Sequence, residues 1–141
     1  MSRGRKFWIS GLLGFLSLSV VSFFASAQQT ESVQGPKISW ESSTHDFGDI
    51  NQGDRVEKTF TFTNTGNEPL IITNVQVSCG CTLPKNWPRD PVSPGNKGEL
   101  TVAFNSAGKF GKQNKVVTIV SNSVNKDGSQ LLFSANVIEK K

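Results

Sequence analysis

The two cysteines of this 141-residue chain stand one residue apart, in the segment SCGCTLP at residues 78–84. Two thiols at this spacing can close a small disulfide, bind a soft metal ion, exchange disulfides with another protein or supply a nucleophile. Gly80 between Cys79 and Cys81 favours the tight backbone that a disulfide ring needs, and Thr82 completes the motif. A three-residue ring gains only about 1.6 kcal/mol from chain entropy, so its stabilising value is small.

As metal ligands, Cys79 and Cys81 suit Cu(I) better than harder ions. A closed zinc site needs two further ligands, and beyond residue 27 the sequence offers one histidine, His45, and no methionine. We interpret His45 as a surface or turn residue. We therefore predict no resident cofactor, with Cu(I) held by the two cysteines as the alternative.

Thiol exchange and nucleophilic catalysis have weaker sequence support. Exchange enzymes commonly place Cys-x-x-Cys at a helix N-terminus, whereas this motif precedes Pro84. Lys85 and Arg89 follow and would favour a thiolate, although solvated side chains are the usual explanation for such residues. A Cys–His nucleophile requires His45 to lie beside a thiol. Since no GxSxG, phosphate loop or paired carboxylates occur in the sequence, we predict that the chain is not an enzyme.

The elements that must position these residues are strands. Short β-branched and aromatic runs alternate with Gly, Asn and Pro turns, and helical periodicity is absent. Ile71, Val75 and Val77 are in phase, which predicts that they share one face of a strand. The pattern predicts an antiparallel β-sandwich of about seven strands. We expect these strands at residues 37–41, around 47, and at 55–63, 70–77, 99–104, 115–120 and 131–137.

The segment after the cysteines holds four of the six prolines, at residues 84–95. Such density favours a stiff, extended loop at one end of the sandwich rather than a central strand. Trp87 and Arg89 are of the residue types most often found as binding hot spots, so this loop is a candidate partner-binding site. The alternative is that Trp87 folds back and caps the core.

The N-terminus predicts export. A basic patch precedes an apolar stretch at residues 7–24 and then Ala25-Ser26-Ala27, the order found in secretory signal peptides. We expect a signal peptide at 1–27, a flexible leader at 28–36 and one β-sandwich domain at 37–141, in the periplasm or outside the cell. An uncleaved membrane anchor is the alternative. After cleavage, 12 basic and 11 acidic residues remain, so nucleic-acid binding has no support and no membrane span is expected.

Five short motifs recur in one known family, and they stand at residues 46–48 (DFG), 64–70 (NTGNEPL), 79–82 (CGCT), 94–95 (PG) and 120–122 (VSN). Over residues 38–137 the chain resembles a bacterial family of exported domains of unknown function, which is similar to the abnormal-spindle/hydin type of immunoglobulin-like domain. The resemblance implies an immunoglobulin-like sandwich but supplies no activity. We expect a non-enzymatic interaction or scaffold module with a protein partner in the cell envelope. A thiol-redox or Cu(I)-binding protein is the alternative.

Overall fold

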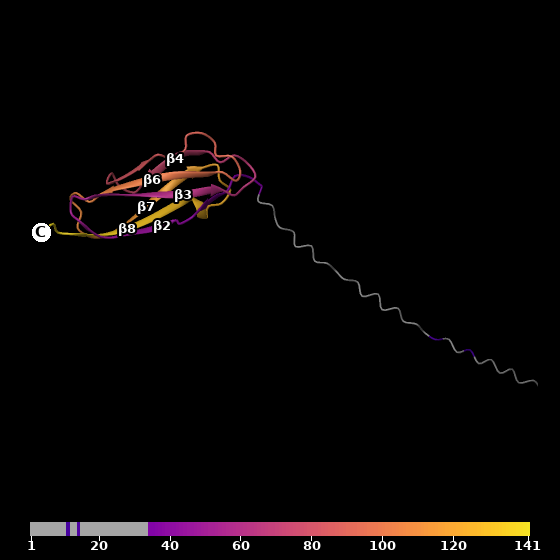
Figure 1. Ribbon diagram of the computed structural model, residues 1–141, viewed down its shortest axis with the longest axis horizontal. Helices are drawn as coiled ribbons and strands as arrows, with labels where there is room; N and C mark the ends of the chain where they lie inside the picture. The colour runs from indigo at the N-terminus through magenta and orange to yellow at the C-terminus, as the bar shows by residue number, and fades with distance from the viewer. Residues whose placement is uncertain (1–10, 12–13, 15–33) are drawn as a thin grey trace, which may run out of the picture. The chain divides into compact units, whose positions relative to one another are not determined.

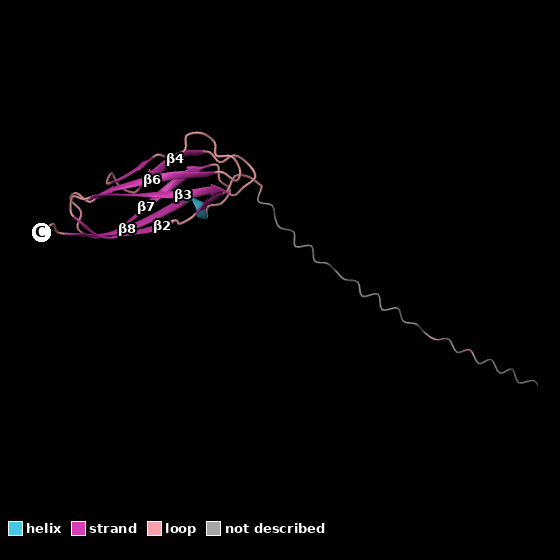
Figure 2. Ribbon diagram, in the orientation of Figure 1, coloured by secondary structure: helices cyan, strands magenta, loops and turns pink. Residues whose placement is uncertain are grey.

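The computed structural model describes residues 11, 14 and 34–141, and the last of these segments carries all the regular structure in Figures 1 and 2. Between residues 34 and 141 the chain forms eight strands and a single turn of 3-10 helix. The elements are β1 (Ile38–Trp40), β2 (Thr44–Asn51), β3 (Arg55–Asn64), β4 (Ile72–Val77), β5 (Thr82–Lys85), β6 (Lys97–Asn105), β7 (Gly111–Ser121), η1 (Asp127–Ser129) and β8 (Gln130–Ile138).

The strands form two four-stranded sheets whose inner faces meet, as in Figure 1. Sheet A has the order β1-β3-β6-β5, and sheet B has the order β2-β8-β7-β4. Phe104 of sheet A and Phe133 of sheet B bring their ring centroids to 5.5 Å across the interior. The predicted β-sandwich is confirmed. One pair, β2 with β8, is parallel, which side-chain alternation cannot reveal because it is the same in both strand directions.

The inner faces follow the predicted alternation. Alternate residues of β6, β8 and the second half of β3 point into the core, although the outward Thr101 and Ala103 of β6 are buried as well. Each large apolar side chain buried in the core contributes about 1.5–3 kcal/mol. The strongest contributors are Phe60, Phe62, Leu100, Val102, Phe104, Leu131, Phe133 and Val137. β7 lies between β8 and β4, so the strand expected at residues 115–120 is an interior strand of sheet B.

Strand β4 departs from its predicted phase at its first residues. Ile71 is 40% exposed, whereas the next residue, Ile72, is 6% exposed and belongs to the core. A register shift against β7 between Ile72 and Asn74 inserts one extra residue into β4. Such a bulge reverses the alternation, so the predicted inward position of Ile71 is wrong while Val75 is buried as expected.

Strand β5 was not expected from the sequence, and its last two residues, Pro84 and Lys85, lie in the segment predicted to be a loop. It pairs with β6 at the edge of sheet A. Pro84 lacks a backbone N–H and is tolerated there because an edge strand leaves one side unpaired. The proline density therefore excludes a central strand, as predicted, but it does not exclude an edge strand.

The turn at residues 64–70 ties the start of the domain to the sandwich. Asn64 is fully buried, and its side chain accepts hydrogen bonds from Lys37 N at 3.2 Å and Gly66 N at 3.0 Å. A Cβ on Gly66 would lie 2.1 Å from the carbonyl oxygen of Gly35, so only glycine fits this close approach. Side chains of this turn therefore satisfy backbone N–H groups that the strands leave unpaired.

The predicted leader ends earlier than residue 36. Gly35 and Pro36 are buried, and Gly35 N donates to Asn67 Oδ1 at 2.7 Å, so these two residues belong to the folded domain. The rest of the predicted leader up to residue 33, and the predicted signal peptide apart from Gly11 and Gly14, lie outside the described residues. Within the residues that are described, no helix has the length and hydropathy needed to cross a membrane.

Candidate functional site

The two cysteines lie where the chain crosses from sheet B to sheet A, in the turn between β4 and β5. Cys79 and Cys81 form a disulfide with their Cα atoms 5.3 Å apart. Backbone hydrogen bonds fix the same turn: Thr82 N donates to Cys79 O at 3.3 Å, and Asn105 N donates to Cys81 O at 2.9 Å. The turn is therefore held by the backbone as well as by the sulfur bridge.

Gly80 and Thr82, the other two residues of the motif, have different roles from those that the sequence suggests. Gly80 is exposed, a Cβ there would meet no atom within 4 Å, and its φ is not in the left-handed region, so packing does not require glycine. Thr82 is 4% exposed, and its Oγ1 lies 3.6 Å from Cys79 Sγ and 4.0 Å from Cys81 Sγ. Because disulfide sulfurs carry no hydrogen, the Thr82 hydroxyl is the donor in these contacts.

A small pocket of about 150 Å³ opens beside this disulfide. Cys81 lines it, together with Arg55 at the start of β3 and Leu83 on β5. Leu83 is 56% exposed and Arg55 is exposed. The disulfide therefore has an accessible side with an apolar wall and a cationic one, and we refer to these three residues and Cys79 as the disulfide corner.

His45 lies far from the sulfurs. It is on β2, at the edge of sheet B opposite to β4, and three inter-strand spacings separate these edges by about 14 Å. The Cys–His nucleophile considered from the sequence is therefore excluded. Among residues 34–141 no cluster of three or more His, Cys, Asp or Glu side chains could hold a metal ion. Copper binding by the reduced pair of cysteines stays a prediction.

The environment of His45 agrees with a surface role at the rim of the sandwich. Its ring makes an edge contact with Phe47, with centroids 4.5 Å apart. Burial lowers the pKa of His45, and the positive charge of Lys58 acts in the same direction, against a smaller opposite effect of Asp46. The imidazole is therefore neutral at pH 7.

The loop after β5 places Trp87 against the core, which is the alternative position considered from the sequence. Trp87 is half-buried, and its indole Nε1 is buried without a hydrogen-bond partner. The guanidinium of Arg89 lies 3.7 Å from the indole centroid and covers the ring, a favourable cation–π contact. Arg89, which is exposed, is thus the accessible member of the pair, and binding by this loop stays a prediction.

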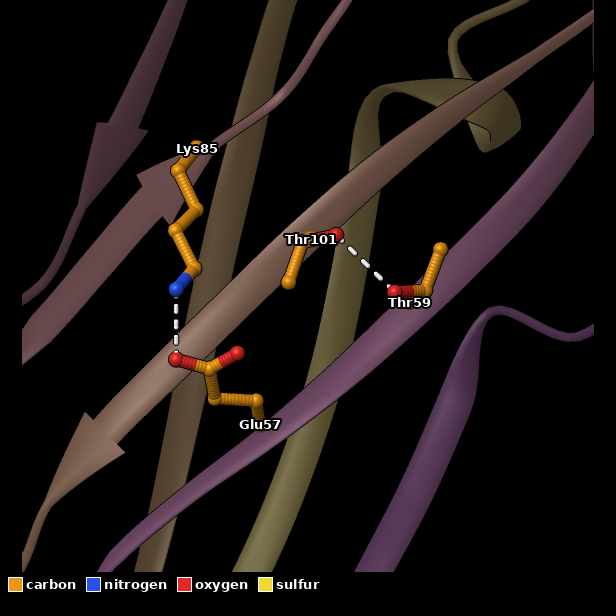
Figure 3. A network of polar contacts seen from close by, with 4 residues as sticks. All are labelled: Glu57, Thr59, Lys85 and Thr101. Atoms are coloured by element: carbon orange, nitrogen blue, oxygen red, sulfur yellow. Dashed lines mark hydrogen bonds and ion pairs between the residues drawn. The ribbon is translucent and has the colours of Figure 1, made fainter.

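Polar pairs cross the middle of the outer face of sheet A. In Figure 3, the Lys85 ammonium reaches across β6 to the Glu57 carboxylate, and Thr59 Oγ1 and Thr101 Oγ1 lie 2.9 Å apart. Ala103 is the registered partner of Glu57 on β3, and it is only 4% exposed beneath these side chains.

The outer face of sheet B holds a groove of about 460 Å³. We call it the sheet B groove; its lining residues are Thr44, His45, Asp46, Asn114, Lys115, Val116, Leu132, Phe133 and Ser134. Leu132 on β8 is registered with Thr44 on β2 and with Val116 on β7, and it is 45% exposed. The sequence interpretation missed this site. Leu132 alternates with the buried residues of β8, so its outward position was the available signal.

One end of the sheet B groove carries a fixed negative charge. Gly48 N donates to Asp46 Oδ1 at 2.9 Å, and this hydrogen bond lowers the pKa of the Asp46 carboxyl. A hydrogen bond with Ser134 and the charge of Lys112 act in the same direction. The groove thus combines an apolar row with an ionised carboxylate.

Comparison with solved structures shows the same fold in proteins of little sequence similarity. A protein of unknown function from Porphyromonas gingivalis W83 is 17% identical, with a TM-score of 0.63 over 74% of this chain and 48% of that one. The PapD-like domain 7 of human CEP192 is 9% identical, with a TM-score of 0.59 over 76% of this chain and 89% of the domain. The secreted serine protease VesC from Vibrio cholerae is 18% identical, with a TM-score of 0.55 over 72% of this chain and 23% of the protease.

The chain thus spans about half of the Porphyromonas gingivalis protein and about a quarter of the protease. At these identities the likeness shows an immunoglobulin-like, PapD-like sandwich and nothing of activity. No curated protein matches the sequence. A family model matches residues 38–137, so the chain belongs to DUF1573, a family of proteins of unknown function.

Proposed function

We propose that this protein is an exported, non-enzymatic interaction module that binds an extended segment of a cell-envelope protein in the sheet B groove. The observation that carries the proposal is the exposure of Leu132, 45%, at the centre of a groove of about 460 Å³. Export rests on the N-terminal sequence pattern alone. β-Sandwich domains commonly serve interaction roles, which supports the proposal by analogy of fold.

The groove favours docking on the face of the sheet over addition of a strand at its edge. Every edge strand carries a feature that blocks strand pairing: β1 has three residues, β5 contains Pro84, and β2 and β4 both have register shifts. Such features protect exposed edges from pairing with other chains. A partner segment is therefore held by side chains over the sheet.

The lining residues specify the chemistry of that segment. Leu132 and Val116 form the apolar part, which suits an aliphatic side chain. The ionised Asp46 lies two residues along β2 from Thr44, on the same side of the groove, and suits a lysine or arginine. We therefore propose a segment in which an aliphatic residue stands close to a basic one.

Selection of peptides from a random displayed library on the purified chain tests this proposal. Enriched peptides are expected to pair aliphatic with basic residues. Leu132→Asp should weaken their binding about tenfold or more, as for a central anchor residue. Ile138→Asp is the matched control, because Ile138 is 41% exposed on the same strand but outside the groove.

Binding that survives Leu132→Asp but is lost in Arg89→Ala would transfer the site to the loop at Trp87. Peptides enriched in acidic residues, or binding indifferent to both substitutions, would reject the groove as the docking site.

A further inference from the structure

We propose that the Cys79–Cys81 disulfide is an exchange site for the dithiol of a partner protein, in which Cys81 is the sulfur attacked and Cys79 is the sulfur that leaves. The site is the disulfide corner, on a different surface from the sheet B groove, so the proposal stands whether or not the groove binds peptides.

The disulfide contributes little to the fold, which exchange requires. Closing a ring of three residues removes little entropy from the unfolded chain. The hydrogen bonds from Thr82 N to Cys79 O and from Asn105 N to Cys81 O hold the same turn without the bridge. The chain can therefore pass between its oxidised and reduced forms while the sandwich stays folded.

The pocket at the corner selects the sulfur that an incoming thiolate reaches. Cys81 lines the pocket of about 150 Å³, whereas Cys79 does not. Arg55 on the pocket wall attracts the anionic nucleophile, and the exposed side chain of Leu83 offers an apolar contact to the residue that carries it. Attack at Cys81 follows from this access.

The buried hydroxyl of Thr82 favours departure of the other sulfur. Thr82 Oγ1 lies closer to Cys79 Sγ, at 3.6 Å, than to Cys81 Sγ, at 4.0 Å, and it is the donor. A donor of this kind stabilises the thiolate that develops on Cys79 as the disulfide breaks, and a better leaving group leaves faster. Thr82 thus acts as a positioning residue for the leaving sulfur.

The exchange balances in two steps. The partner thiolate attacks Cys81 Sγ, a partner–Cys81 disulfide forms, and the electron pair of the broken sulfur bond departs on Cys79. The second thiolate of the partner then attacks the partner's own sulfur, closes the partner disulfide and releases Cys81. Two electrons pass from the partner dithiol to the cysteine pair, and the two protons lost by the partner are taken up by Cys79 and Cys81.

Brief reaction of the purified oxidised chain with glutathione, followed by excess N-ethylmaleimide that stops the reaction and caps the released thiol, tests the assignment. Peptide mapping by mass spectrometry is expected to find glutathione on Cys81 and maleimide on Cys79, with at least fivefold preference. Equal distribution, or glutathione mainly on Cys79, would overturn the proposal.

Substitutions distinguish the contribution of the Thr82 hydroxyl to the exchange rate from that of the Arg55 charge. Thr82→Val should slow the exchange about threefold to tenfold, and Thr82→Ser, which keeps the hydroxyl, should restore the rate. Arg55→Gln should slow it about twofold to threefold at low salt and not at 1 M salt, where charges are screened. Lys112→Gln, an exposed cation on the other sheet, is the control and should leave the rate unchanged.

Circular dichroism checks that each variant is folded. A folded Thr82→Val chain that exchanges at the original rate contradicts the role of the hydroxyl. If Thr82→Val does not fold, the position of the glutathione and the effect of Arg55→Gln decide the assignment.

Discussion

The outer faces of the two sheets differ although both are built from strands with the same alternation. On sheet A, Thr101 and Ala103 of the central strand β6 point outward and are nevertheless only 8% and 4% exposed. On sheet B, Leu132 occupies the comparable outward position of β8 and is 45% exposed. A small residue is thus covered on one face, and a large apolar residue is open on the other.

The difference arises from the length of the flanking side chains. Over Ala103, Glu57 from β3 and Lys85 from β5 are long enough to meet across β6 and pair (Figure 3). Beside Leu132, the registered neighbours are Thr44 and Val116, which are too short to close over it. The ion pair therefore covers the middle of sheet A and leaves the apolar Leu83 exposed at the disulfide corner, whereas sheet B leaves an apolar row in the middle of its face for another molecule. Exposed apolar surface bordered by polar residues is typical of interaction sites.

Among the substitutions suggested by this comparison, Ala103→Leu is expected to lower the free energy of unfolding most. At 4% exposure Ala103 has little room above it apart from the small pocket that it helps to line, and overpacking of this kind costs about 1–3 kcal/mol. Val116→Leu is the matched control on sheet B. It adds one methylene to an open groove, and we expect a change within about 0.5 kcal/mol in the free energy of unfolding.

Urea unfolding of both variants measures this contrast. Equal destabilisation by the two substitutions would show that sheet B is covered to the same degree as sheet A. A neutral Ala103→Leu would show that the ion pair lies loosely over β6.

Lys85→Ala removes the ion pair with Glu57 over sheet A, and it is expected to lower the free energy of unfolding by a smaller amount. The pair is partly exposed, with side-chain exposures of 38% for Lys85 and 44% for Glu57, so its loss costs about 0.2–1 kcal/mol. The control is Lys97→Ala, which removes the pair with Glu41 at exposures of 64% and 58%. Because this second pair is more solvated, we expect a smaller change in the urea midpoint, and the opposite order would contradict the covering role of Lys85.

Much of the sandwich follows from periodicity, since apolar residues recur at every second position on the inner sides of β6, β8 and the second half of β3. The bulge in β4 does not, because one extra residue in a ladder leaves no distinct pattern at Ile71 and Ile72. Strand β5 was not predicted because it contains Pro84. Proline fits a strand at the edge of a sheet, and whether β5 lies at an edge depends on the order of the strands in sheet A. That is a tertiary property, and local sequence does not carry it.

The candidate sites could likewise be predicted only in part from the sequence. Two cysteines separated by one residue can be recognised from the sequence, but the accessible side of their disulfide cannot. That side is lined by Arg55, which is 26 positions away from Cys81 in the sequence. The two residues come together only because β3 and β5 both pair with β6. The sheet B groove needs β2, β7 and β8 in register. The parallel pairing of β2 with β8 that creates this register could not be inferred from residue types.

The smallest change in stability is expected on acidification. It tests sheet B separately from sheet A because, among the described residues, the two groups with a shifted pKa both lie on β2 of sheet B. The pKa of His45 is lowered from 6.5 in the folded chain, so the unfolded chain binds the proton first. Stability should therefore fall as the pH falls below about 6.5. Asp46 has a pKa lowered from 3.8, so its contribution should be lost only at more acidic pH, below 3.8.

Urea midpoints at pH 7.5 and pH 5 measure the first of these steps, and His45→Gln should reduce the difference between them. The carboxylate of Asp46 stays ionised over this range and raises the pKa of His45, so Asp46→Asn should slightly enlarge that difference while weakening the binding of basic peptides in the groove. A chain that becomes more stable on acidification, or an unaltered difference in His45→Gln, would place the imidazole in an environment other than the rim between Phe47 and Lys58.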